Sequence, residues 1–207
     1  MKFLVIAITV LFATGASAYD APFGLTWGLS KDGLNRIVEG LSEHSDNNGI
    51  KTVVFESSPI DPSETYQYIG LIDKELGPFK VIWIGKSIEG DLYGSEGKEA
   101  FEKFQSIIKS NYELSEEFEF TKTGLKLYEE ALKLYEEADE FYQCLAYDGC
   151  GKYVSVYQIT GGGAISIELQ GNGRGAGSFK LQYEAPIFSE VMKKSKEKVN
   201  SKNKNAF

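Results

Sequence analysis

Six short apolar segments, arranged in two groups of three, constrain the fold of this chain more than any other feature. The first group spans residues 51–56, 65–72 and 79–84, and the second spans 153–160, 164–170 and 177–183. The segments are rich in β-branched and aromatic residues and are separated by glycine- and proline-containing stretches, which is typical of strands. The connections within each group are short, so antiparallel pairing is favoured over parallel crossovers.

Helical periodicity flanks and separates the two groups. Ser30 can cap a first helix, whose buried face is marked by four apolar residues at i, i+3, i+4 and i+7: Leu34, Ile37, Val38 and Leu41. Gly40 and the polar stretch 42–49 end this helix. A second helix is predicted over residues 96–111 with Ser95 as its cap, and a last one from Pro186 through Val191.

Residues 125–138 contain an identical tandem heptad, LKLYEEA followed by LKLYEEA. Seven residues turn a helix through about 700°, so an inserted heptad leaves the buried face almost unrotated. We therefore expect one long helix near residues 123–145. Two heptads are too few to define a coiled coil, so packing against the protein's own sheet is favoured over binding a partner helix.

The resulting order is helix, three strands, two helices, three strands, helix. This order predicts an α+β fold, with a mostly antiparallel sheet or sheets packed by amphipathic helices. The two halves are alike in outline, and the sequence leaves open whether they form one continuous sheet or two. A single domain is expected over residues 19–191, because this length suffices for one core.

The first eighteen residues have the features of a secretory signal peptide. Lys2 is followed by an apolar run over residues 3–12, and residues 16–18 are the small residues Ala-Ser-Ala. Cleavage is expected before Tyr19. The apolar run is too short for a membrane span, so no stable membrane anchor is predicted. The mature protein is expected to be periplasmic or secreted.

Charge is distributed unevenly along the chain. Residues 19–191 carry 15 basic and 29 acidic side chains, a net charge of −14. Such an acidic body argues against binding nucleic acid, whose phosphates need Lys and Arg. Residues 192–207 contain six lysines and one glutamate and are expected to form a disordered tail, with contact to anionic lipid as the alternative.

Cys144 and Cys150 are the only cysteines. Export to an oxidising compartment predicts a disulfide between them, closing the small loop CLAYDGC. In the chain-entropy model a loop of this size contributes roughly 2 kcal/mol. A redox or metal site is disfavoured, because there is no CxxC motif and no nearby histidine.

Four motifs invite a catalytic or ligand-binding interpretation, and each has a simpler explanation. The glycine run 171–177 precedes a strand-like segment, whereas a nucleotide-binding loop opens a helix. His44, the sole histidine, lies in a polar stretch that is typical of a solvated loop. Asp46 begins a segment that resembles a calcium loop but lacks the glutamate that such a loop requires. Trp27 and Trp83 lie in apolar segments typical of core residues. We therefore predict no catalytic residue, metal or cofactor.

An acidic face within the predicted long helix is the candidate interaction surface. Residues 113–140 carry ten acidic side chains and three lysines. Such a face could steer a basic partner or could simply be solvated. The residues assigned to this face are Tyr128, Glu129, Glu130, Tyr135, Glu136 and Glu137.

The segment FGLTWGLSKDGL, residues 23–34, resembles the start of the mature domain in small exported bacterial proteins, with the pattern F-G-L-x-W-G-x-S. This resemblance implies export and lends no catalytic residue. Together with the leader and the acidic body, it favours a non-enzymatic binding protein of the bacterial envelope, with another envelope or secreted protein as its partner. The alternatives are a hydrolase with a dispersed carboxylate site and a carrier of an apolar small molecule.

Overall fold

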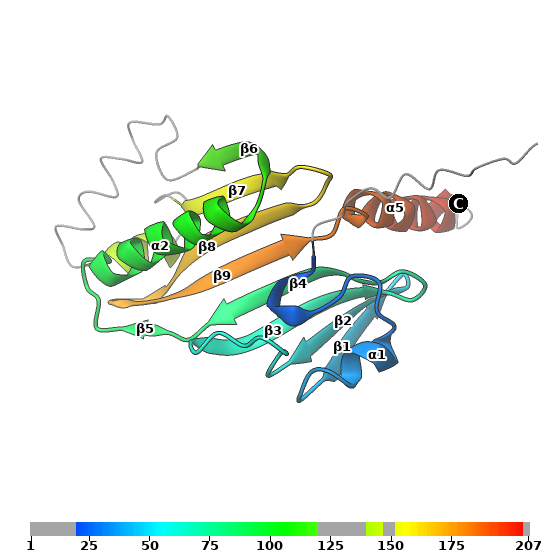
Figure 1. The fold of residues 1–207 in the computed structure, drawn as a ribbon, viewed down its shortest axis with the longest axis horizontal. Coiled ribbons are helices and arrows are strands. Elements are labelled where there is room, and N and C mark those ends of the chain that lie inside the picture. Colours follow the sequence, from blue (N-terminus) through cyan, green and yellow to red (C-terminus); the bar gives the residue numbers. More distant parts are fainter. Residues whose placement is uncertain (1–19, 120–139, 147–151, 205–207) are drawn as a thin grey trace, which may run out of the picture.

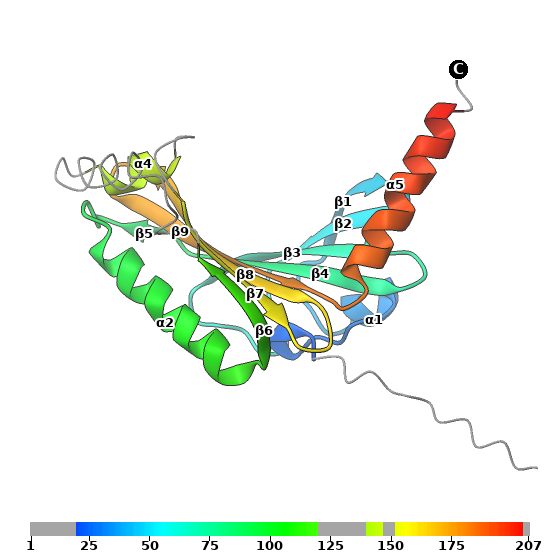
Figure 2. The ribbon, with the colours of Figure 1, turned by 90° about the horizontal axis from the view of Figure 1, so that it is seen from above.

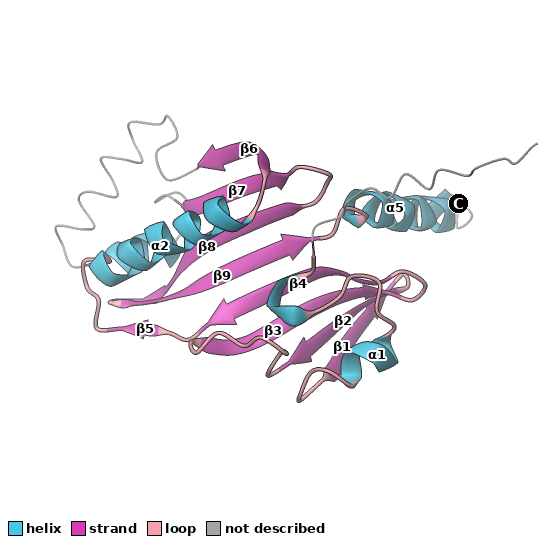
Figure 3. Ribbon diagram, in the orientation of Figure 1, coloured by secondary structure: helices cyan, strands magenta, loops and turns pink. Residues whose placement is uncertain are grey.

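The computed structural model describes residues 20–119, 140–146 and 152–204 and shows one open antiparallel sheet (Figures 1 and 3). Eight of its strands follow the order β1-β2-β3-β4-β9-β8-β7-β6, and β5 pairs with β9. The strands are β1 Ser42–Asn47, β2 Ile50–Phe55, β3 Thr65–Asp73, β4 Gly77–Gly85, β5 Ile88–Glu89, β6 Leu114–Glu119, β7 Tyr153–Ile159, β8 Ala164–Gly173 and β9 Ala176–Glu184.

Helices lie on both sides of this sheet (Figure 2). The helices are the 3-10 turn η1 Pro22–Gly24, α1 Lys31–Asn35, α2 Ser95–Asn111, α4 Phe141–Ala146 and α5 Phe188–Lys204. We call the sheet face that packs against α2 the covered face, and the opposite face the open face. The first turns of α5 pack on one end of the open face.

The α+β prediction is confirmed, and the number of sheets is now known. The predicted strand segments overlap β2, β3, β4, β7, β8 and β9, and β4 pairs with β9 to join the two halves into one sheet. The strands β1 and β6 were not predicted. They lie at the two outer edges, so each half contributes four strands to the sheet instead of three.

The two halves are related by an approximate two-fold rotation perpendicular to the sheet. Its centre is the pairing of Ile82 in β4 with Gln182 in β9, and the register is symmetric about that pair. In this register the rotation places β4, with the sequence GPFKVIWIG, on residues 177–185, with the sequence GSFKLQYEA. Both halves also place a helix before their four strands, α1 in the first and α2 in the second.

Aromatic side chains fill the core on the covered face. Trp83 is 1% exposed and contacts Phe104 of α2, which also packs edge-on against Phe179. Tyr68 stacks on Phe55 with ring centroids 4.9 Å apart. These contacts assign alternate residues of each strand to the covered face, and the residues between them to the open face.

The first helix is shorter than predicted. The Ser30 hydroxyl caps it by accepting the Gly33 N–H at 3.0 Å, as expected, but α1 ends at Asn35. The chain then turns, with Gly40 at a φ of 67°, and enters β1, where a polar loop was predicted. All six residues of β1 are exposed, so the edge strand has no alternation of apolar residues that could have revealed it.

The predicted second helix is confirmed, but Ser95 does not cap it. Gly94 occupies the cap position with a φ of 72°, and the Asp91 carboxylate accepts the N–H groups of Ser95 and Gly97 at 2.9 and 3.0 Å. A carboxylate at this end of a helix is favourable, because the free N–H groups carry partial positive charge.

The C-terminal prediction is wrong, because α5 continues to Lys204 instead of ending at Val191. Packing of its first turns explains this continuation. Val191 is 3% exposed and clusters with Phe79 and Ala185, so a helix that begins on a core extends into a lysine-rich segment of low apolar content. Most of the predicted long helix, and residues 205–207, lie outside the described residues.

Candidate functional site

Four half-buried aliphatic side chains lie together on the open face, and we call them the aliphatic patch: Val54, Ile69, Ile82 and Ile84. Val54, Ile69 and Ile82 are direct neighbours across β2, β3 and β4. None of the four belongs to either buried cluster or packs against one. The patch is therefore apolar surface that the described helices leave uncovered.

Three residues of the patch, Val54, Ile69 and Ile82, belong to a row that crosses the whole sheet. One residue from each of eight strands is directly opposite the next: Ser42, Val54, Ile69, Ile82, Gln182, Ser166, Val156 and Phe118. The two-fold centre falls between Ile82 and Gln182. Phe118, at the edge, is 45% exposed.

Comparison of the two halves shows that the fold does not require aliphatic residues in the patch. The rotation that superposes the halves places Ile69 on Ser166, Ile82 on Gln182 and Ile84 on Glu184. The same register and strand geometry therefore accommodate polar side chains in the second half. Only Val54 has an apolar counterpart, Val156.

Two ion pairs lie beside the patch and leave it without net charge. The Lys80 ammonium is 2.8 Å from Glu184, and the equivalent Lys180 is 2.6 Å from Glu168. All four side chains are at most 25% exposed. The charged groups of the central open face therefore neutralise each other across neighbouring strands.

A buried network fixes α4 against the N-terminus of α2. The Tyr142 hydroxyl donates to Asp91 Oδ2 at 2.8 Å, on the same carboxylate that caps α2. Burial raises the pKa of the Tyr142 hydroxyl, and the hydrogen bond to Asp91 raises it further. A Cβ on Gly97 would lie 2.2 Å from this hydroxyl, so glycine leaves room for the contact.

The glycine run has a packing role. Gly171 and Gly177 belong to the β8–β9 hairpin, and a strand follows them, as predicted. A Cβ on Gly171 would lie 1.8 Å from the Tyr142 carbonyl oxygen, and one on Gly177 would lie 2.1 Å from the Tyr142 ring. These glycines let α4 approach the hairpin.

A shallow pocket of about 270 Å³ lies beside α4 and the end of β8. Polar residues dominate its lining, which comprises Leu145, Ala146, Lys152, Tyr153, Glu168, Leu169, Gln170, Gly171 and Asn172. We assign no ligand to this pocket.

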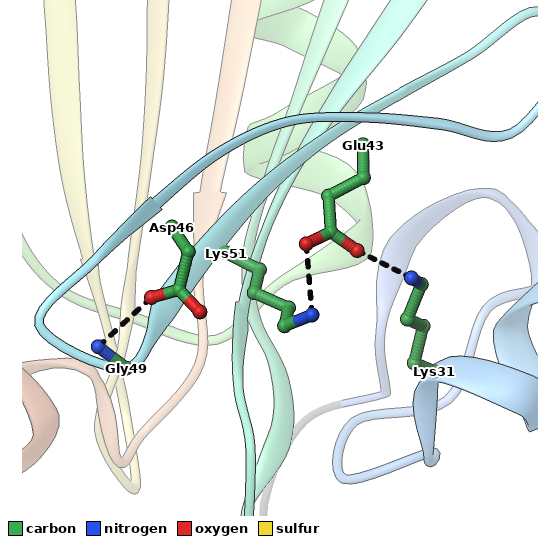
Figure 4. Close-up of polar contacts among 5 residues, drawn as sticks. All are labelled: Lys31, Glu43, Asp46, Gly49 and Lys51. Carbon is green, nitrogen blue, oxygen red and sulfur yellow. Dashed lines mark hydrogen bonds and ion pairs between the residues drawn. The ribbon is translucent and has the colours of Figure 1, made fainter.

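Glu43 and Asp46, which lie on either side of His44 in β1, make separate polar contacts at the protein surface (Figure 4). Glu43 accepts hydrogen bonds from Lys31 and from Lys51, the latter at 2.8 Å, and these bonds lower its pKa to about 2. Asp46 accepts the Gly49 N–H at 3.1 Å within the Asn48-Gly49 turn, where both residues have positive φ. This two-residue turn joins β1 to β2, with Asn47 opposite Ile50.

The predicted site residues fall mostly outside the described part of the chain. Cys144 is fully buried on α4, but Cys150 is not described, so the disulfide stays a prediction. The six residues of the acidic face, Tyr128, Glu129, Glu130, Tyr135, Glu136 and Glu137, also lie outside it. Trp83 is in the core, as predicted, and its Nε1 donates to Thr65 Oγ1 at 2.8 Å.

Within residues 20–119, 140–146 and 152–204, no group of three or more His, Cys, Asp or Glu side chains could hold a metal ion. Among the helices of those same residues, none combines the length and apolar character needed to cross a bilayer. No protein-family model, curated protein or solved structure matches the chain.

The aliphatic patch was missed because its residues were interpreted only as strand formers. A signal was present in the sequence: the run VIWI in β4 is apolar on both faces, whereas LQYE in β9 alternates. Since both follow the shared G-x-F-K pattern, aligning them would have shown that one half has an apolar open face and the other does not.

Proposed function

We propose that this protein is an exported, non-enzymatic interaction protein, and that it binds an apolar segment of another exported protein on the aliphatic patch. The observation that supports this most is the asymmetry between the halves. Ile69, Ile82 and Ile84 are aliphatic on an uncovered face at positions where the second half has Ser166, Gln182 and Glu184. Uncovered apolar surface of this kind is typical of interaction sites.

The chemistry of the partner follows from the charges beside the patch. Lys80 and Lys180 are already paired with glutamates, so an ionic partner would have to break these pairs. An uncharged apolar segment, such as one face of an amphipathic helix, would bury the patch without that penalty. The leader and the resemblance to exported proteins support a partner in the same compartment.

The test uses the double substitution I69S/I82Q, which gives the patch the residues of the second half. Because those residues already occur in the same fold, the variant is expected to stay folded. The matched control I60S/I107Q changes two exposed isoleucines outside the patch, which are 68% and 44% exposed. Each protein is tagged, produced with its leader, and used to capture partners from envelope extract.

We expect one stoichiometric partner with the wild type and the control, and at least tenfold weaker binding of that purified partner to I69S/I82Q. Equal binding of the partner by both variants would reject the patch as its site. Sedimentation of the purified chain as a dimer that I69S/I82Q dissociates would mean that a second copy covers the patch, and would contradict the proposal.

A further inference from the structure

Helix α5 concentrates positive charge in a chain that is otherwise acidic. Residues 188–204 contain six lysines and two glutamates, whereas the whole chain has a net charge of −8. Lys193, Lys196 and Lys198 are exposed, as are the charged residues between them, Lys194 and Glu197. The helix therefore forms a positive projection on a negative body.

The first turns of α5 are fixed by packing. Phe188, Val191 and Met192 contact the cluster around Phe79 and Ala185, and Lys80 lies over the Phe188 ring at 5.2 Å. The rest of the helix extends beyond the sheet (Figure 2). At 1.5 Å per residue, the twelve residues after Met192 span about 18 Å, which is roughly two Debye lengths at physiological salt.

Carboxylates compensate only part of the charge on this projection: the pKa of Lys194 is raised by its hydrogen bond to Glu190 and, more weakly, by the charges of Asp73 and Glu75. The ion pair within α5 joins Glu190 to Lys194 at 2.6 Å and lowers the pKa of Glu190. Across the described residues, no carboxylate lies within 4 Å of the ammonium groups of Lys193, Lys196 or Lys198. These lysines are free to interact with an external anionic surface.

We propose that α5 binds the surface of a bilayer containing anionic phospholipids, through contacts between its lysines and lipid phosphates. The lysines are spread around the exposed circumference of the helix. They can therefore contact the many phosphates of a lipid surface, whereas a single carboxylate partner would reach few of them. The exposed residues of α5 include no aromatic side chain on which a nucleic-acid base could stack. Repulsion of the acidic body by the same surface confines the contact to the projecting helix.

The experiment measures co-sedimentation of the native, processed protein with vesicles. One set contains phosphatidylcholine alone, and the other contains phosphatidylcholine with 30% phosphatidylglycerol. The test variant is K193Q/K196Q/K198Q, and the matched control R36Q/K103Q/K152Q removes three exposed cations elsewhere. Circular dichroism establishes that both variants keep the helix content of the wild type.

We expect binding to the anionic vesicles only, with about a fivefold contribution from each lysine. The test variant should therefore partition about 100-fold more weakly, whereas the control should match the wild type, and 0.5 M NaCl should abolish binding. Equal partitioning of the two variants, or no binding at 50 mM NaCl, would overturn the proposal. So would binding to single-stranded DNA without binding to vesicles. The I69S/I82Q variant should bind vesicles like the wild type, so failure of the patch proposal is a separate result.

Discussion

The contact between Gly97 and Tyr142 yields a stability prediction with a defined sign. Replacing Gly97 by alanine adds a methyl group 2.2 Å from the Tyr142 hydroxyl oxygen. Alanine gains at most about 1 kcal/mol over glycine from helix propensity. Against this, overpacking costs about 1–3 kcal/mol, and a displaced hydroxyl loses a hydrogen bond to a carboxylate worth about 1.5–3 kcal/mol. G97A should therefore destabilise the protein by about 1.5–5 kcal/mol.

The same substitution should have little effect once the hydroxyl is absent. Y142F alone should cost about 1.5–2 kcal/mol, because Asp91 loses a donor while keeping the N–H groups of Ser95 and Gly97. In that background G97A should cost less than about 0.5 kcal/mol, since the nearest remaining atoms are 3.1–3.2 Å from the new methyl group.

Urea unfolding of the four proteins measures this coupling. The exposed S106A substitution on α2 serves as a control and should be additive with Y142F. A cost of G97A that is equal in the two backgrounds, within about 0.5 kcal/mol, would refute the proposed packing of Tyr142 against the N-terminus of α2.

Three further predictions concern individual polar contacts. Burial and the hydrogen bond to Asp61 raise the pKa of Tyr68 from its ordinary value of 10 to about 12. The folded state therefore keeps this proton to higher pH than the unfolded state, and the free energy of unfolding should fall between pH 10 and 12. In urea titrations Y68F should remove that part of the pH dependence, and an unchanged profile would contradict the prediction. The Glu43 carboxyl should titrate near pH 2 in carbon-detected NMR, and its pKa should rise toward the ordinary value in 0.5 M NaCl. A pKa that does not change with salt would argue against the ion pairs with Lys31 and Lys51. Loss of the Ser30 cap in S30A should lower the free energy of unfolding by about 1 kcal/mol. S30D should keep most of the wild-type stability, because an aspartate can also cap the helix. Equal losses of stability in S30A and S30D would exclude capping.

The sequence predicts the strands of this fold well where one face is buried. β2, β3, β4, β7, β8 and β9 all carry apolar residues on the covered face and end at glycine-rich or polar turns. The edge strands β1 and β6 are polar and mostly exposed, so hydrophobic periodicity gives them no signal. Their existence depends on pairing with β2 and β7, which is a tertiary effect.

Helix boundaries and caps were harder to predict, because they depend on contacts distant in sequence. Asp91 caps α2 from four residues before Ser95, and Tyr142 supports it from a separate segment. Likewise, α5 continues past Val191 because its first turns pack on Phe79 and Ala185, which the composition of the tail could not reveal. Predicting the aliphatic patch from the sequence would have required knowing which faces of β3 and β4 remain uncovered in the folded protein.

The most direct test of the account is site-specific photo-crosslinking in living cells. A photoreactive amino acid at position 82 lies in the centre of the aliphatic patch, and one at position 107 lies on the exposed side of α2. The account predicts a discrete adduct with one exported protein from position 82 and none from position 107. The same adduct from both positions, or an adduct from position 107 alone, would show that the open face is not where this protein binds its partner.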